Sequence, residues 1–281
     1  MASDQHPTDL VSLRTPLDPE RLRATLVGAD GEGFYTRVDV VDETTSTNAD
    51  LLAAAADGGD RQVLLAEYQN GGRGRHSRSW NGVPGAQVIV SVLLRLSDCP
   101  LQNLGWLPLL CGIATVDAVR EVTGVPAQLK WPNDVLVDGR KLAGILVEVA
   151  STSPEPVVVA GIGINVTLER DDLPVPTATS LLLENAADLD RTRLAEALLA
   201  GFGDRIRAWA RADWDTAELA AAYREHCSTI GLAVRAILPG DTELRGVAVD
   251  VDDQGRIVIR PDTEGAPVAV AAGDITHLRP A

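Results

Sequence analysis

Lysine is almost absent from this chain of 281 residues. Of its 25 lysine and arginine side chains, only Lys130 and Lys141 are lysines, and every other one is arginine. Two lysines in so long a chain can be an accident of composition. Because an ammonium group is more compact and more flexible than a guanidinium group, both positions are also candidates for a site where arginine does not fit.

Cysteine and histidine are also scarce, and neither forms a recognisable metal or catalytic pattern. The three cysteines, Cys99, Cys111 and Cys227, are odd in number and widely spaced, which argues against a disulfide framework and is typical of a reduced cytosolic compartment. The four histidines are far apart and show neither metal-ligand nor triad spacing. Metal-dependent and serine-dependent hydrolysis therefore have no support in the sequence.

Long hydrophobic runs are missing as well. No apolar run reaches the ~18 residues that a membrane-spanning helix needs, and the polar first residues do not resemble a secretory signal. We therefore expect a cytoplasmic protein without a membrane partner. The net charge of −15 predicts that the chain repels nucleic acid, so a local cluster of cations is informative.

Hydrophobic patterning predicts alternating strands and helices over most of the chain, which is typical of an α/β fold. Residues 1–16 resemble a loose tail, and a short helix follows with Asp18 as its N-cap. A hairpin is expected around the Asp138-Gly139 turn. Strands are expected at 34–43, 61–69, 86–96, 128–130 and 156–168. Helices are expected after the Thr/Ser/Asn cluster at 44–48, at 101–124 and twice within 190–226.

The composition changes just past Cys227. From Thr229 onward the chain contains only short strands, which are joined by turns such as PGDT and DDQG. About 50 residues of this kind predict a small β-barrel appended to the α/β part.

The segment GGRGRHSRSW (71–80) brings together three arginines, Arg73, Arg75 and Arg78, with no acidic residue between Asn70 and Asn81. Glycines let backbone N–H groups approach an anion, and guanidinium groups bind phosphate or carboxylate oxygens two at a time. The segment lacks the Gly-Lys-Ser/Thr of a Walker loop. It predicts a positive pocket for an anion, the alternative being a solvated arginine-rich turn.

Both lysines lie in LKWPNDVLVDGRKLAGILVE (129–148). Lys141 begins an apolar strand that would anchor its backbone, while its flexible ammonium group can follow an anion through a reaction. Asn133 and Asp134 lie between the lysines and can be merely a turn. If they point into the same cleft, Asp134 could orient an incoming amine or accept its proton.

Two further segments carry weaker signals. GIGIN (161–165) lacks the third glycine and the helix of a dinucleotide-binding fingerprint. Its glycines would instead let a strand lie against a flat ligand, with Asn165 as a hydrogen-bonding residue. Ser46, Thr47 and Asn48 can form a helix N-cap, and this interpretation is favoured over a binding role.

Together these motifs resemble the biotin protein ligases. TTSTN, AEYQNGGRGR, KWPNDVLVDGRKLAGILVE and GIGIN occur in the order and spacing of that family, and the resemblance covers roughly residues 34–281. It implies an α/β catalytic domain similar to class II aminoacyl-tRNA synthetases, with a mixed sheet and helices, followed by a small SH3-like β-barrel. We accordingly expect a tail and short helix at 1–33, a catalytic biotin- and ATP-binding domain at 34–227 and the SH3-like domain at 228–281.

The resemblance also implies a reaction in two steps. The carboxylate of biotin attacks the α-phosphate of ATP, with Mg²⁺, and gives biotinyl-5′-AMP and pyrophosphate. A lysine of a biotin carboxyl carrier domain, from acetyl-CoA carboxylase or a related acyl-CoA carboxylase, then attacks the acyl group and releases AMP.

Site residues follow from the resemblance by position. The catalytic residues would be Lys141, Arg75 and Asp134. The biotin-binding residues would be Ser46, Thr47, Asn48, Gln69, Gly72, Arg73, Gly74, Arg75, Lys141 and Gly144. The residues that bind ATP or the adenylate would be Arg75, Arg78, Trp80, Lys130, Asn133 and Asn165. No protein residue is assigned to the metal.

Some features separate this chain from parts of the family. Ser77 stands where the family's loop has a glycine, and serine tolerates positive φ poorly. Some members carry a DNA-binding winged helix, but only about 33 residues precede the first catalytic strand, too few for that motif. We expect a ligase without repressor function, as a monomer or homodimer. The alternatives are a lipoate–protein ligase and, disfavoured, a biotin-responsive DNA-binding regulator.

Overall fold

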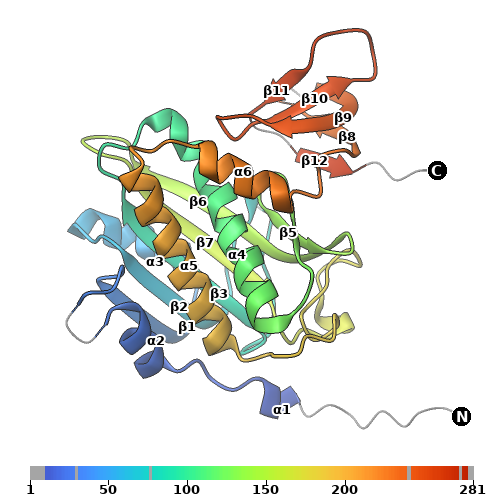
Figure 1. Cartoon of the computed structure of the whole chain (residues 1–281). Helices are drawn as coiled ribbons and strands as arrows, with labels where there is room; N and C mark the ends of the chain where they lie inside the picture. Colours follow the sequence, from blue (N-terminus) through green and yellow to red (C-terminus); the bar gives the residue numbers. More distant parts are fainter. Residues whose placement is uncertain (1–9, 29–30, 76–77, 239–241, 272–273, 278–281) are drawn as a thin grey trace, which may run out of the picture.

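The structure is a computed structural model that describes residues 10–28, 31–75, 78–238, 242–271 and 274–277 (Figure 1). These residues form a large sheet flanked by helices and a smaller sheet built from the last part of the chain. Ser77, the expected departure from the family's loop, lies outside the described residues.

Seven strands form the large sheet in the order β1-β2-β3-β7-β6-β5-β4. Strands β1 and β2 run parallel and every other neighbouring pair is antiparallel, so the sheet is mixed, as predicted. Strand β3, between β2 and β7, is buried on both faces, which explains its largely apolar sequence. The strands are β1 (Arg37–Thr44), β2 (Gln62–Gln69), β3 (Gln87–Arg95), β4 (Gln128–Lys130), β5 (Asp134–Val137), β6 (Arg140–Ser151) and β7 (Val157–Asn165).

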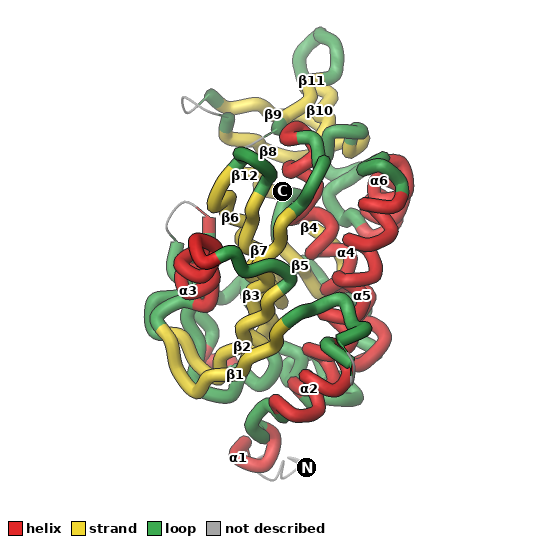
Figure 2. Tube along the Cα trace, turned by 90° about the vertical axis from the view of Figure 1, so that its left-hand side faces the viewer, coloured by secondary structure: helices red, strands yellow, loops and turns green. Residues whose placement is uncertain are grey.

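Helices cover both faces of this sheet (Figure 2). On one face lies α3 (Thr47–Ala54), which the 3₁₀ turn η1 (Ala55–Asp57) extends. The helices on the other face are α2 (Pro19–Leu26), α4 (Leu107–Thr123), α5 (Arg191–Arg211) and α6 (Ala217–His226). Helix α4 is buried almost all round, as its apolar sequence predicts. Within the part of the chain that is described, no helix is both long and apolar enough to span a membrane.

The N-terminal segment differs from the loose tail that the sequence predicts. Leu10–Leu13 forms the short helix α1. Arg14 donates to the backbone carbonyl of Thr167 at 2.9 Å and pairs with Asp172, in the 3₁₀ turn η4 (Arg170–Asp172), at 3.3 Å. The prediction is wrong for residues 10–16, because the partners that order this segment lie more than 150 positions away, at separations of 153 and 158.

The helix expected at 101–124 is divided in two. Its first six residues form the 3₁₀ turn η3 (Leu101–Trp106), and α4 begins at Leu107. Pro108 lies in the first turn of α4, where its missing N–H has no helical partner to lose. The helix ends at Gly124, whose φ of 72° is a left-handed conformation that suits glycine.

Five antiparallel strands form the second sheet in the order β11-β10-β9-β8-β12. Several of its apolar side chains, among them Val234, Ile257 and Ile259, are fully buried. The predicted change to short strands is confirmed. The strands are β8 (Ala233–Ile237), β9 (Glu243–Val251), β10 (Ile257–Pro261), β11 (Val268–Val270) and β12 (Asp274–His277).

Two buried tryptophans of the large domain attach this second sheet through one turn. The indole N–H of Trp106 donates to the carbonyl of Asp253 at 2.8 Å, and that of Trp131 donates to the carbonyl of Gly255 at 2.9 Å. Gly255 has a φ of 73°, which a larger residue would adopt at a cost. The contact fixes the turn beside the segment that carries Asn133 and Asp134.

The three cysteines are buried free thiols. Burial raises the pKa of Cys99 to about 11 and that of Cys111 to about 12, and it also raises the pKa of Cys227. Since the thiolate is the reactive form, these thiols are poor nucleophiles and poor metal ligands at neutral pH. They belong to the core, in agreement with the absence of a metal pattern in the sequence.

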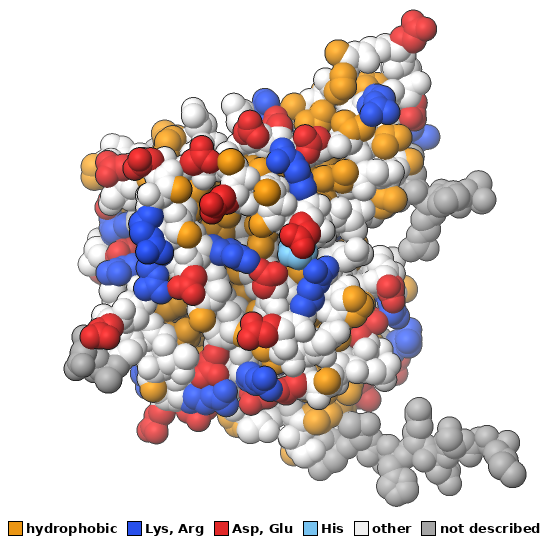
Figure 3. Space-filling view, viewed as in Figure 1, with side chains coloured by type: hydrophobic (Ala, Val, Ile, Leu, Met, Phe, Trp, Pro, Cys, Tyr) orange, Lys and Arg blue, Asp and Glu red, His pale blue; other side chains and the backbone are white. Residues whose placement is uncertain are grey.

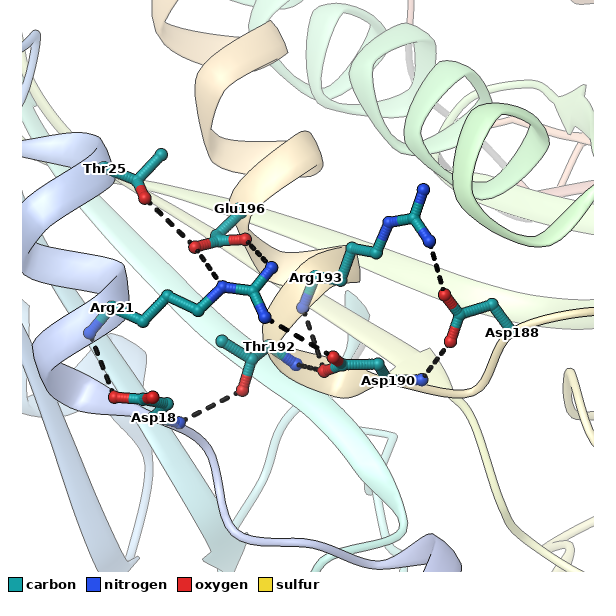
Figure 4. A network of polar contacts seen from close by, with 8 residues as sticks. All are labelled: Asp18, Arg21, Thr25, Asp188, Asp190, Thr192, Arg193 and Glu196. Atoms are coloured by element: carbon teal, nitrogen blue, oxygen red, sulfur yellow. Dashed lines mark hydrogen bonds and ion pairs between the residues drawn. The ribbon is translucent and has the colours of Figure 1, made fainter.

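Helices α2 and α5 are joined by capping groups and ion pairs (Figure 4). Asp18 caps α2 by accepting from the backbone of residues 20 and 21, as predicted, and its own N–H donates to Thr192 at 3.1 Å. Asp190 caps α5 in the same way. Arg21 pairs with Glu196 at 2.6 Å. The network holds α2 against the first turns of α5.

Arg191 lies in the chain between Asp190 and Thr192 of this network and is almost fully buried. Its guanidinium group pairs with Glu67 at 2.7 Å and donates to the carbonyls of Gln87 at 3.2 Å and Thr15 at 2.6 Å. One side chain thus joins α5, β2, β3 and the N-terminal segment. Because the Arg191 guanidinium is buried, water cannot take the place of Glu67 if that ion pair is broken.

We predict that Arg191→Ala lowers the free energy of unfolding by about 3–5 kcal/mol, since the Glu67 carboxylate, whose side chain is only 16% exposed, loses its cationic partner. The matched control is Arg193→Ala, two positions along the same helix, whose side chain is 55% exposed in a pair with Asp188. That change should cost less than about 1 kcal/mol. Urea denaturation measures both, and equal losses would contradict the assigned role.

Candidate active site

A cavity of about 580 Å³ lies on the face of the large sheet that carries α3. Its walls come from the start of α3, the loop after β2, strands β3, β6 and β7, and the turn between β4 and β5. Every predicted site residue except Gly72 lines it. Segments that are distant in the sequence therefore meet at one place.

The described lining of this cavity is strongly cationic. Asp134 is its only carboxylate, whereas its basic side chains are Arg73, Arg75, Arg78, Lys130 and Lys141. On the face of the molecule that carries α4 and α5, basic and acidic side chains are instead intermixed (Figure 3). In a chain of net charge −15, this concentration of cations confirms the local positive pocket that the glycine- and arginine-rich segment predicts.

Both lysines of the chain pair with the same carboxylate. The ammonium nitrogen of Lys141 lies 2.5 Å from Oδ1 of Asp134, and that of Lys130 lies 3.8 Å from Oδ2. The ammonium of Lys141 also lies 5.6 Å from the centre of the Trp80 ring. Both lysines are partly buried in the same cavity and share one partner, which argues that their positions are not an accident of composition.

Strand pairing explains how these three groups meet. Lys130 and Asp134 are directly opposite each other across β4 and β5. Between β5 and β6 the register shifts after Val135, so that Lys141 lies opposite Leu136. Opposite residues share a face of a sheet, and alternate residues of β5 do too. The β-bulge thus brings Lys141 to the face that carries Asp134.

Asn133 connects the arginine loop to this hairpin. Its amide donates to the carbonyl of Ile145 at 2.9 Å, and its Oδ1 accepts from Arg75 at 3.2 Å. The loop itself is folded back, with a bridge between Arg73 and Ser79. The guanidinium of Arg75 is therefore held at Asn133, the residue before Asp134, in the lining of the cavity.

Glycines on β6 and β7 make room for two side chains. A Cβ at Gly161 would overlap Asn48, and one at Gly163 would overlap the indole nitrogen of Trp80. A Cβ at Gly144, which pairs with Gly163, would press on Trp80 and Lys141. Gly163 therefore leaves room for the Trp80 ring, and Gly161 leaves room for the Asn48 amide. That these glycines lie against a flat ligand stays a prediction. The indole N–H of Trp80 is buried and has no hydrogen-bond partner among the residues that the structure describes.

Two predicted binding residues have their side chains committed to the protein. Asn165 accepts from Gln87 at 2.9 Å and donates to the carbonyl of Thr179 at 2.8 Å. Asn48 accepts from Ser91 at 2.6 Å and donates to Glu148 at 2.7 Å. Both amides are nearly fully buried. Their hydrogen bonds fix the walls of the cavity.

Ser46 is the N-cap of α3 and accepts from the backbone N–H of Ala49 at 3.4 Å, so the N-cap interpretation that the sequence favours is confirmed. Ser46 also lines the cavity.

Sequence reasoning missed Ser91, a fully buried lining residue that bonds Thr47 at 2.7 Å. A lone polar residue in the apolar run VIVSVLL was the available signal.

Gly72 lies behind the wall of the cavity. Its carbonyl accepts from the backbone N–H of Trp80 at 2.9 Å, and a Cβ there would overlap Gln69. The residue positions the loop and Gln69, a lining side chain, without facing the cavity itself.

A second cavity, of about 420 Å³, adjoins the first. The two share Arg75, Trp131, Pro132, Asn133, Ile145 and Leu146. Its other walls come from η3 and the start of α4, and from the turn at 254–256 of the second sheet. The two domains therefore both border a passage that reaches the neighbours of Asp134.

Comparison with known proteins places the chain in a family. The Biotin/lipoate A/B protein ligase family model matches residues 39–165, and the Biotin protein ligase C terminal domain model matches residues 229–278. A biotin–[acetyl-CoA-carboxylase] ligase of Mycobacterium tuberculosis is 49% identical over 277 residues, which cover 97% of this chain and 100% of that protein. The chain belongs to the biotin protein ligases. It is a ligase, and the expected α/β fold with a small SH3-like second domain is confirmed.

Two other biotin protein ligases illustrate the range of the similarity. The bifunctional ligase/repressor BirA of Escherichia coli is 31% identical over 253 residues, covering 89% of this chain and 76% of that protein. A structure of biotin protein ligase from Aquifex aeolicus in complex with biotin and ATP superposes with a TM-score of 0.73 at 26% identity, covering 88% of this chain and 100% of that one.

We predict that Gly163→Ala displaces the Trp80 ring, because the added Cβ would overlap the indole. Iodide quenching of tryptophan emission should increase as the ring becomes accessible. The control is Gly201→Ala in α5, where a Cβ meets nothing within 4 Å. In a Trp80→Phe background the effect of Gly163→Ala should disappear, and its persistence would contradict this packing.

Proposed function

We propose that the chain activates biotin with ATP and transfers it to a lysine of a biotin carboxyl carrier domain of acetyl-CoA carboxylase or a related carboxylase. A carboxylate oxygen of biotin attacks the α-phosphorus, and the bond to pyrophosphate breaks. The carrier amine then attacks the acyl carbon, an amide bond forms and AMP leaves. Membership of the biotin protein ligases supports both steps.

The charge of the cavity is the observation that carries this proposal. Biotin's carboxylate and the phosphates of ATP repel each other, and five cations beside a single carboxylate offset that repulsion. Cations that are already in place stabilise the charge of the transition state without reorganising, and the loss of one such group typically slows a reaction by ~10²–10³.

Lys141 is proposed to carry the first step. Its ammonium group would leave Asp134 and bridge the carboxylate of biotin and the α-phosphate, a movement that its flexible stem allows. Lys130 would remain at the other oxygen of Asp134 and hold that carboxylate in place. The arginines of the loop would bind the phosphates through their planar, two-pronged groups.

Asp134 is proposed to act in the second step. Once Lys141 has moved, Oδ1 would be available to the ammonium group of the carrier lysine. A carboxylate in that position orients the amine and accepts the proton that it must lose before attack. The folded loop above the cavity would limit hydrolysis of the adenylate by excluding water.

Magnesium fits this site as a companion of ATP. Among the described residues no group of three or more histidine, cysteine or acidic side chains is arranged to hold a metal ion. Mg²⁺ in nucleotide sites is usually held by phosphates, waters and one or two carboxylates. Asp134 is the carboxylate of the described lining that would hold it, and the ion would supply charge to the departing pyrophosphate.

We predict that Lys141→Ala reduces transfer of biotin to a purified carrier domain by ~10²–10³, measured as the gain in carrier mass with biotin and ATP-Mg. Lys141→Arg separates charge from shape, since it keeps the cation but makes it planar and bulkier. We expect little rescue by arginine, and full activity of Lys141→Ala would contradict the proposal.

Arg75→Ala should form the adenylate but release it faster.

The choice of acid separates two functions that the family name covers. A lipoate–protein ligase would show exchange of pyrophosphate into ATP with lipoate. We expect biotin to support this exchange with the purified chain and lipoate to fail. We also propose that the chain does not bind DNA, and sequence-specific binding in a gel-shift experiment would overturn that part.

We further propose that the carrier lysine enters through the second cavity, because this cavity shares a wall with the first beside Asp134. The prediction is that Gly105→Phe, which places a ring in this cavity, slows carrier transfer at least tenfold and leaves formation of the adenylate unchanged. Gly105→Ala is the matched control, because its Cβ meets only the carbonyl of Gln254 at 3.5 Å. Equal transfer rates in the two variants would contradict this route.

A further inference from the structure

The reactive intermediate of the proposed function poses a problem for the enzyme itself. Any amine within reach can attack the acyl carbon of the adenylate, form an amide and expel AMP, while its surplus proton passes to a base or to water. The enzyme's own lysines are therefore alternative acceptors. The following inference rests on the proposed function.

Arginine avoids this side reaction, whereas lysine does not. Because the reference pKa of lysine, about 10.4, lies well below that of arginine, the neutral, nucleophilic form is on the order of a thousandfold more abundant for lysine than for arginine at the same pH. Holding such an amine beside the acyl carbon would raise its effective concentration to roughly 10⁵ M or more. A lysine in the loop over the cavity would thus compete with the carrier.

The chain places guanidinium groups where cations are needed around the cavity. The loop supplies Arg73, Arg75 and Arg78, and outside the cavity every basic Lys/Arg residue of the whole sequence is arginine. A bias in composition alone explains many arginines. It does not explain why the two remaining lysines both border the same cavity and pair with one carboxylate.

Each resident lysine is tied to one oxygen of Asp134, Lys141 to Oδ1 and Lys130 to Oδ2. An ammonium in an ion pair has no lone pair with which to attack carbon. The pairing also fixes the position of each nitrogen, because the carboxylate is itself held on β5 between the two strands that carry the lysines.

We propose that the cavity is built to exclude free amines from the acyl-adenylate, so that the carrier lysine is the preferred acceptor. Guanidinium groups provide the loop's charge, Asp134 restrains Lys130, and Lys141 passes from Asp134 to the phosphate, so that both ammonium groups stay paired with an anion. Asp134 is thereby a positioning residue for Lys130 in addition to its proposed part in transfer.

The test uses the full chain with biotin and ATP-Mg but without carrier. Chromatography of the biotinyl adenylate comes first, because absence of the adenylate would refute the proposed function and not this inference. Peptide mass mapping then locates biotin on the protein. The variants in the loop over the cavity, called the lid variants, are Arg73→Lys and Arg78→Lys. The charge-matched control is Arg193→Lys in α5, on the opposite face of the sheet.

We expect biotin on residue 73 or 78 of the lid variants at least tenfold faster, per adenylate formed, than on any lysine of the native chain or the control. The rate should be independent of enzyme concentration and should rise about tenfold per pH unit near neutrality, as the free amine fraction does. A merely structural effect would not follow that pH dependence. Adenylate-forming lid variants that stay unlabelled would overturn the proposal.

A second variant tests the restraint by Asp134. Asp134→Asn, supplied with preformed biotinyl adenylate, should gain biotin at Lys130 at least tenfold faster than the native chain. Calorimetry first verifies that this variant binds the adenylate. Labelling of Lys130 in the native chain at the same rate as in the variant, or no labelling of Lys130 in a variant that binds, would contradict the restraint.

Discussion

The pairing of two ammonium groups with one carboxylate is the interaction on which the rest of the site depends. Lys130, Asp134 and Lys141 come from three adjacent strands, and a bulge in β6 puts the last of them on the correct face. In the free chain the carboxylate is shared by both ammonium groups. Under the proposed function, anionic ligands compete with Asp134 for Lys141, so binding and activation are coupled through a single ion pair.

The remainder of the fold keeps this group in place. Helix α4 supports the sheet from behind, Trp131 joins the adjoining turn to the second domain, and Asn133 connects it to the arginine loop. Glycines on β6 and β7 leave space for a flat ring where any Cβ would intrude. The amides of Asn48 and Asn165 are held in the walls by hydrogen bonds within the protein.

Local patterns in the sequence predicted much of this. The Asp-Gly turn, the N-caps at Asp18 and Ser46, and the change to short strands all depend on neighbours in the chain. The helical turn at residues 10–13 depends on Arg14 reaching Thr167, and the role of Ser91 depends on α3 packing over β3. Neither contact can be inferred from local sequence. The bulge that orients Lys141 belongs to the same class, since register is decided by paired strands.

A chain with two lysines allows a direct test of the central ion pair, because ¹⁵N labelling of lysine side chains gives two ammonium resonances, which Lys130→Arg assigns. In the free protein, Asp134→Asn should shift both resonances. With biotin and a non-hydrolysable ATP analogue bound, the same substitution should shift Lys130 alone, since Lys141 has moved to the ligands. A Lys141 resonance that is unchanged by the ligands and still sensitive to Asp134 would contradict the account.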